Sequence, residues 1–215
     1  MLLDFEACLW RSAPSSQALA VLSDCRYARA MAIETELKAP CFLVAVPQLG
    51  DPNFSRGVVF ILEHTDEGSM GIVINKPSTL DMGSFCESQQ MEFKGDNSRL
   101  VYQGGPVQTD RAFLLHISEH EGPETETIVD GIRLSYSLES LRLIVENPPD
   151  KLRVFLGYAG WSPGQLAEEV TQGAWLVMSP LANLVFGSGD EEIWNAALKE
   201  MGIDAVQLMH SGAVH

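Results

Sequence analysis

Residues 41–77, CFLVAVPQLGDPNFSRGVVFILEHTDEGSMGIVINKP, decide the fold. They contain three short runs rich in β-branched and aromatic residues, separated by turn-forming residues, which is typical of strands joined by loops. The runs at 57–64 and 71–77 flank a four-residue turn that begins at Thr65, so together they predict a β-hairpin. The run at 41–47 predicts a buried strand.

The same patterns continue along the chain. Further strands are expected at 99–107, 111–118, 151–160 and 173–180, and in a hairpin over 127–137 that turns at Asp130-Gly131. Helices are expected at 78–88 with Ser78 or Thr79 as N-cap, at 138–147, after Ser162, and at 191–201 behind a capping box at 188–191. Strands outnumber helices and often follow one another directly. This order predicts an α+β fold with largely antiparallel pairing.

The composition is that of an acidic globular chain. Of 215 residues, 46% are hydrophobic, which is enough to bury a substantial core. The 29 Asp and Glu residues outnumber the 14 Lys and Arg residues, and the formal net charge is −15. Such a charge repels nucleic-acid backbones, and the basic residues are scattered, so direct nucleic-acid binding is not expected. No apolar run approaches the roughly 20 residues of a membrane-spanning helix, so no membrane association is expected.

The cysteines and histidines give no sign of a metal site. The four cysteines, Cys8, Cys25, Cys41 and Cys86, form no C-x-x-C pair, and the chain has no H-E-x-x-H motif. Cys41 and Cys86 have apolar neighbours, which predicts buried free thiols. Free thiols suit a reducing compartment, so we expect a cytosolic protein with no metal and no cofactor.

Residues 1–38 differ in character from the rest of the chain. Acidic and basic residues balance within the first 30, so the net negative charge lies downstream, and no strand pattern is present. Met31 lies shortly before the first convincing strand. We expect 1–38 to be an N-terminal extension, either poorly ordered or an over-extended gene start, and 39–215 to form a single domain.

Residues 160–164, Gly-Trp-Ser-Pro-Gly, match the G-x-S-x-G pattern that carries the nucleophile of many serine hydrolases. Asp190 or Asp204, followed by His210, would complete the order Ser, acid, His. However, the residue after Ser162 is Pro163, which lacks the backbone N–H that an oxyanion hole needs at this position. The same residues read well as a helix start, with Ser162 as N-cap and Gln165 completing a capping box. The helix start is therefore the favoured interpretation.

Six residues are candidates for a ligand or partner surface. Asn75 and Lys76 place an amide and an ammonium at a strand end, where they could line a pocket, although a solvated strand end is the simpler interpretation. Gly104 and Gly105 could let a ligand approach the backbone, although a tight turn is the simpler interpretation. Tyr158 and Trp161 flank the helix start and could face a partner.

Three blocks of this sequence resemble the YqgE/AlgH family: residues 42–77, VYQGGPVQTDRAFLLH (101–116) and LGYAGWSPGQLAEEV (156–170). The resemblance implies a mixed, partly closed β-sheet with flanking helices in a cytosolic bacterial protein. It brings no catalytic residues and no cofactor, and it carries a label of transcriptional regulator. We therefore expect a non-catalytic regulatory or binding protein that acts through a protein partner or a small ligand. The alternatives are a regulator that binds DNA directly and a serine hydrolase that uses Ser162.

Overall fold

The computed structural model describes residues 37–117, 122–129, 131–187, 189–205 and 208. Residues 1–36 lie outside this part, so the expectation for the N-terminal extension stays a prediction. The described strands belong to one connected sheet. They are β1 (Cys41–Ala45), β2 (Val58–Thr65), β3 (Gly68–Val73), β4 (Pro77–Asp81), β5 (Leu100–Gln103), β6 (Val107–His116), β7 (Thr125–Val129), β8 (Ile132–Ser135), β9 (Leu152–Trp161) and β10 (Trp175–Met178).

The sheet is mixed and largely antiparallel. Its main path runs β10-β1-β2-β3-β9-β6-β8-β7, with antiparallel pairing at each step. β5 pairs in parallel with β9 and carries β4 on its other side. The sheet curls into a partly closed half-barrel, so the predicted α+β fold is confirmed. The predicted hairpins at 57–77 and 127–137 are the pairs β2–β3 and β7–β8.

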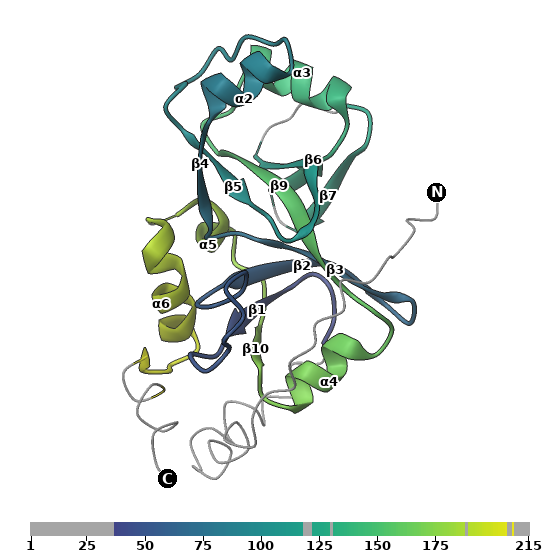
Figure 1. Cartoon of the computed structure of the whole chain (residues 1–215), viewed down its shortest axis with the longest axis vertical. Helices are drawn as coiled ribbons and strands as arrows, with labels where there is room; N and C mark the ends of the chain where they lie inside the picture. The colour runs from purple at the N-terminus through teal and green to yellow at the C-terminus, as the bar shows by residue number, and fades with distance from the viewer. Residues whose placement is uncertain (1–36, 118–121, 130, 188, 206–207, 209–215) are drawn as a thin grey trace.

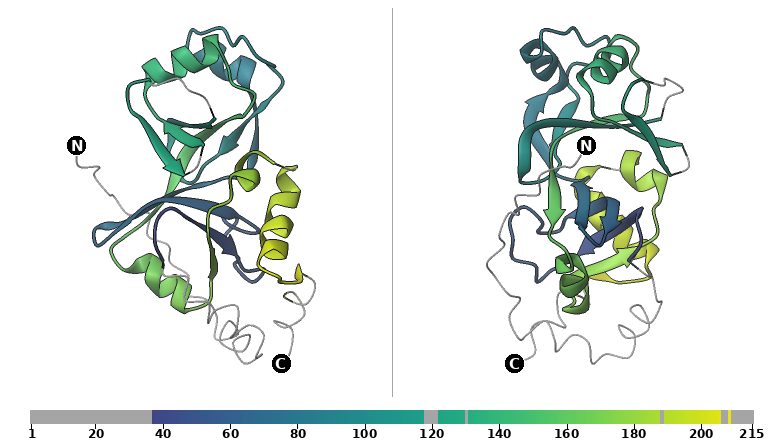
Figure 2. Two further views of the ribbon diagram at one scale, coloured as in Figure 1. Left: turned by 180° about the vertical axis from the view of Figure 1, so that it is seen from behind. Right: turned by 90° about the vertical axis from the view of Figure 1, so that its right-hand side faces the viewer.

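Five helices flank the described sheet: α2 (Met82–Ser88), α3 (Leu138–Glu146), α4 (Gln165–Thr171), α5 (Ala182–Phe186) and α6 (Asp190–Glu200). Figure 1 shows two lobes: α2 and α3 cap the upper one, whereas α4, α5 and α6 surround the lower one. β9 runs through both, and the turned views show the same division (Figure 2). Its first half pairs with β6, and its last three residues pair with β3.

The alternation of side chains along β1 explains how the lower lobe is packed. Phe42 and Val44 point into a core that also holds Ile193 and Trp194 of α6. Leu43 points the other way, into a core that holds Leu166 of α4. Successive side chains of a strand leave opposite faces, so β1 is covered on both sides and reads as a continuous apolar run. A third core lies under α2 and α3 in the upper lobe.

The predicted helix at 78–88 begins later than expected. Residues 77–81 form β4, because Pro77 and Asp81 pair with Tyr102 and Leu100 of β5. The Ser78 hydroxyl donates to a carbonyl of β5 instead of capping a helix. The N-cap of α2 is Asp81, whose carboxylate accepts the Ser84 N–H at 2.7 Å.

The other helix expectations hold in part. α3 matches the prediction and has Ser137 as its N-cap, but Leu138 at its first position is 51% exposed and not on the buried face. Ile193 and Ala197 of α6 are buried. Gly189 occupies the N-cap of α6 without a side-chain hydrogen bond, and Ser188 lies outside the described residues. The sequence patterns missed the short helix α5.

Candidate functional site

Asn75 and Lys76 hold the loop before β2 against the end of β3. The Asn75 side-chain oxygen accepts the Val58 N–H at 2.8 Å, and its amide donates to the Arg56 carbonyl at 2.9 Å. The Lys76 ammonium donates to the Ser55 carbonyl at 2.6 Å, and burial lowers the pKa of this ammonium. Both side chains are bound to the protein's own backbone.

Gly104 and Gly105 lie where the chain crosses β9. A Cβ atom on Gly104 would lie 2.2 Å from the Gly157 carbonyl oxygen, and one on Gly105 would lie 2.2 Å from the Tyr158 carbonyl carbon. The Gly104 carbonyl also accepts the Val73 N–H at 2.8 Å. The close approach that these glycines permit is therefore made by the backbone of β9.

Tyr158 and Trp161 are both 3% exposed. The Tyr158 ring packs edge-on against Phe113, with ring centres 6.0 Å apart. The Trp161 indole N–H donates to Glu169 Oε2 at 3.0 Å, and the Trp175 indole donates to the same oxygen at 2.8 Å. The rings of both candidate residues therefore belong to the packed interior.

The six sequence candidates do not form one exposed surface. Asn75, Gly104, Tyr158 and Trp161 are buried, and their polar groups meet other parts of the same chain. A role for these residues in ligand or partner binding stays a prediction.

Ser162 precedes α4 but does not cap it. The N-cap of α4 is Gly164, which has φ 75° and so adopts the left-handed conformation that glycine favours. Half of the predicted capping box is present, because Gln165 Oε1 accepts the Ser162 N–H at 3.0 Å. The helix starts later than expected because residues 162–165 form a turn, closed by the Gln165 N–H on the Ser162 carbonyl at 3.1 Å. His210, the base of the hydrolase hypothesis, lies outside the described residues.

Two other serines contact histidines. His116 Nε2 lies 2.9 Å from Ser135 Oγ, and His64 Nδ1 lies 2.7 Å from Ser69 Oγ. Ser135 is 0% exposed and Ser69 is 2% exposed, so a substrate in solution cannot reach either hydroxyl in this conformation. The contacts satisfy buried polar groups, as most polar groups in protein interiors require.

Cys41 and Cys86 are buried free cysteines, as predicted. Among the residues with a described position, no three His, Cys, Asp or Glu side chains are grouped so that they could hold a metal ion. Within the same ranges, no helix combines the length and the apolar character needed to cross a bilayer.

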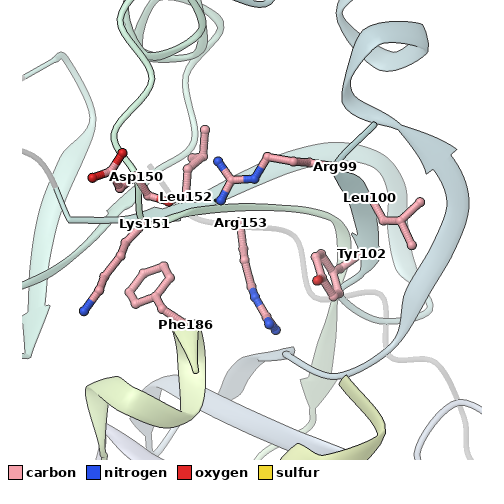
Figure 3. A pocket seen from close by; sticks show the side chains of 8 residues that line it. All are labelled: Arg99, Leu100, Tyr102, Asp150, Lys151, Leu152, Arg153 and Phe186. Carbon is pink, nitrogen blue, oxygen red and sulfur yellow. Dashed lines mark hydrogen bonds between the residues drawn. The ribbon is translucent and has the colours of Figure 1, made fainter. Parts of the chain in front are cut away.

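A cleft of about 220 Å³ lies between the two lobes (Figure 3). β5, the start of β9 and α5 form its walls. Its lining residues are Arg99, Leu100, Tyr102, Asp150, Lys151, Leu152, Arg153 and Phe186. In Figure 3 the Phe186 ring rises from α5 between the side chains of Lys151 and Arg153, and Arg99 reaches toward the chain at Asp150.

The cleft is basic although the protein is acidic. Three cationic side chains, Arg99, Lys151 and Arg153, share the lining with a single carboxylate, that of Asp150. Arg153 is held in place, because it donates to the Ile74 carbonyl at 3.0 Å and its guanidinium carbon lies 4.7 Å from the centre of the Tyr102 ring. The cleft therefore presents positive charge on a rigid wall.

Sequence reasoning missed this cleft, although one signal was available. Lys151 and Arg153 are two residues apart at the start of a predicted strand, so they leave the same face, while Leu152 between them points into the upper core. The contribution of Arg99 could not be inferred, because the fold brings it from 51 residues away to the Asp150 carbonyl.

The fold and the cleft define a two-lobed α+β protein with a basic cleft between the lobes. The DUF179 family model, described as AlgH-like, matches residues 42–206. The chain belongs to this AlgH-like family, which confirms the resemblance seen in the sequence.

Relatives in the family cover most of the chain. A UPF0301 protein of Myxococcus xanthus is 42% identical over 172 residues, which are 80% of this chain and 94% of that protein. A UPF0301 protein of Saccharophagus degradans is 39% identical over 176 residues, or 81% of this chain and 86% of that protein. These names assign no molecular activity.

Solved structures share the fold. The solution structure of the AlgH protein from Pseudomonas aeruginosa has a TM-score of 0.67 and 31% identity, covering 96% of this chain and all of that chain. The crystal structure of DIP2367 from Corynebacterium diphtheriae has a TM-score of 0.62 and 21% identity, covering 86% of this chain and 97% of that chain.

Proposed function

We propose that the protein is a non-catalytic binding protein of the cytosol that acts in regulation by holding a small ligand in the cleft between its lobes. One observation carries the proposal: three cationic side chains, two from the start of β9 and one from the residue before β5, line one small concave site in a chain of net charge −15. Concave sites with a few convergent polar groups and aromatic walls are the usual form of small-molecule sites.

The position of the cleft gives a physical route to regulation. Phe186 comes from α5 of the lower lobe, whereas Arg99 and Lys151 come from the upper lobe. A ligand held between the lobes adds contacts to both of them, and in this proposal a protein partner recognises the protein with the ligand in place.

The same geometry favours a small ligand over DNA. A cleft of about 220 Å³ is smaller than the roughly 300–1,000 Å³ of drug-sized sites, and it cannot admit a duplex. The overall negative charge also opposes a nucleic-acid backbone. The serine hydrolase alternative finds no support in the structure's placement of Ser162.

The proposal is tested by incubating the full-length protein with a bacterial small-molecule extract and identifying retained compounds by mass spectrometry. The double variant R99Q/K151Q removes two cleft cations, and R142Q/K199Q removes two exposed cations that do not line the cleft. We expect a compound retained by the wild type and R142Q/K199Q but lost from R99Q/K151Q. Retention that is equal in all three proteins contradicts the proposal.

A second assay tests the non-catalytic part of the proposal. The purified protein is offered generic ester, phosphomonoester and peptide substrates, and we expect no turnover that depends on a single side chain. Turnover that is abolished by Ser162→Ala would instead establish the hydrolase alternative.

A further inference from the structure

The lining of the cleft carries more positive than negative charge. Three like-charged side chains around one small site repel one another, and an anion bound among them offsets this repulsion. Asp150 supplies one carboxylate, and it is exposed at the rim. The excess positive charge therefore favours a ligand that carries more than one negative charge.

Two of the cations are available to such a ligand. The Arg99 guanidinium donates to the Asp150 carbonyl at 3.0 Å. That contact uses one of five N–H donors and brings no negative charge. The Lys151 side chain is exposed and makes no hydrogen bond or ion pair with another described residue.

The carboxyl group of Asp96 lies outside the cleft and is affected by the charge of Arg99. Hydrogen bonds from Ser98 and, to a smaller degree, the charge of Arg99 lower the pKa of the Asp96 carboxyl. Asp96 does not line the cleft, so a ligand would approach the guanidinium from the other side.

The remaining walls are suited to a planar or apolar body. Phe186 offers a half-buried ring, and Leu100 is 41% exposed at the rim. Arg153 is held against Tyr102, so its charge contributes to the field without having to move. A ligand with an anionic head and a small ring could therefore place the head near Arg99 and the ring beside Phe186.

We infer that the ligand of this cleft is a small phosphomonoester, with Arg99 and Lys151 holding the phosphate and Phe186 packing against its organic part. This inference rests on the proposed function, since it names the chemical class of the ligand. A phosphomonoester carries close to two negative charges at neutral pH. Arginine can donate two parallel hydrogen bonds to phosphate oxygens, and lysine attracts them as a compact positive charge. Arg99 and Lys151 are one group of each kind.

The test is isothermal titration calorimetry on the full-length protein at pH 7.5 and low salt, with phenyl phosphate, inorganic phosphate, sulfate, acetate and benzyl alcohol as probes. We expect phenyl phosphate to bind more tightly than inorganic phosphate, and benzyl alcohol and acetate to bind far more weakly. Loss of one charged hydrogen-bonding group weakens binding roughly 10- to 100-fold. We expect that loss for phenyl phosphate in K151Q and no loss in K199Q.

K151Q is the decisive variant, because the Lys151 side chain makes no hydrogen bond or ion pair with another described residue. Its backbone carbonyl, which accepts the Ile117 N–H, is kept in the variant, so the protein should fold normally. F186A should weaken phenyl phosphate binding while leaving inorganic phosphate binding unchanged. Equal binding of phenyl phosphate by the wild type and K151Q, or no binding at all, overturns the inference. If a compound from the cell extract needs Arg99 and Lys151 but carries no phosphate, the proposed function stands and only the phosphate assignment fails.

The pH dependence separates a phosphate from other anions. The second proton of a phosphomonoester is lost near pH 6, so lowering the pH from 7.5 to 5.5 should weaken phenyl phosphate binding roughly fourfold. Sulfate keeps its charge over this range and serves as the control. The groups facing the ligand are Arg99, Lys151, Arg153 and Asp150. Sulfate meets the same protein groups as phenyl phosphate. A fall in affinity confined to phenyl phosphate therefore identifies the ligand's own ionisation, and an equal fall for sulfate contradicts it.

Discussion

Gly157 and Gly105 meet backbone to backbone at the junction of the two lobes. A Cβ atom on Gly157 would lie 2.4 Å from the Gly105 carbonyl oxygen, closer than real Cβ contacts. Gly157 also has φ 74°, in the left-handed region in the middle of β9. β9 passes from its pairing with β6 to its pairing with β3 in this region, so the contact lies where one lobe joins the other.

We therefore expect Gly157→Ala to lower the free energy of unfolding by about 3 kcal/mol or more, since it adds a steric clash to the backbone strain. Gly164→Ala is the matched control, because Gly164 has φ 75° but nothing within 4 Å of its Cβ position. Strain alone should cost about 1 kcal/mol there. Urea unfolding of both variants measures the difference, and equal losses would show that the clash is absent.

Glu169 should be essential for stability rather than for chemistry. Its carboxylate accepts the indole N–H groups of Trp161 and Trp175 and the side-chain amide of Gln165. Glu169→Ala leaves two buried indole donors without a partner and should cost about 3 kcal/mol or more. Glu169→Gln keeps an oxygen for both indoles and should cost about 1 kcal/mol. If thermal unfolding shows equal losses for the two variants, the indole hydrogen bonds do not contribute as described.

Ser162→Ala should change the free energy of unfolding by no more than about 0.5 kcal/mol, because the hydroxyl does not cap α4. Gln165→Ala should cost about 1–2 kcal/mol, since it removes the bonds to the Ser162 N–H and to Glu169. Chemical denaturation of the two variants tests this order. A larger loss in Ser162→Ala would restore the N-cap role that the sequence suggested.

The buried thiol of Cys41 should make the folded protein less stable at high pH. Burial raises the pKa of the Cys41 thiol from 9.0 to about 11. A folded-state pKa above the unfolded one stabilises the fold fully below pH 9, and this contribution is lost as the pH rises from about 9 to about 11. The contribution is on the order of 2 kcal/mol.

Unfolding measured from pH 8 to pH 11 should therefore show a shallower decline in Cys41→Ala than in the wild type. Other groups titrate in this range in both proteins, so only the difference between the two curves is informative. Identical slopes in the two proteins would contradict the assignment.

The sequence predicted the strands and the two hairpins because local patterns determine them. Runs such as 57–64 combine β-branched residues with a defined turn, and no distant contact is needed to recognise them. The start of α2 was mispredicted because Pro77–Asp81 is held in a strand by pairing with β5, which a local pattern does not reveal.

The site was harder to predict than the fold. Glycines such as Gly104 and Gly105 signal a close approach, but the sequence does not say whether a ligand or the chain itself approaches, and here β9 does. The cleft depends on Arg99, Lys151 and Phe186, which lie far apart in sequence. Only the placement of Lys151 and Arg153 on the same face of a strand could be predicted from the sequence.

The most direct test of the central claim, that the cleft binds an anionic ligand, is a titration of the isotopically labelled full-length protein with inorganic phosphate, followed by two-dimensional amide NMR spectra. We predict saturable shifts of the amides at 99–102, 150–153 and Phe186, all following one binding curve, and their loss in K151Q. Shifts that are absent, that do not saturate, or that gather on residues away from the cleft would contradict the account.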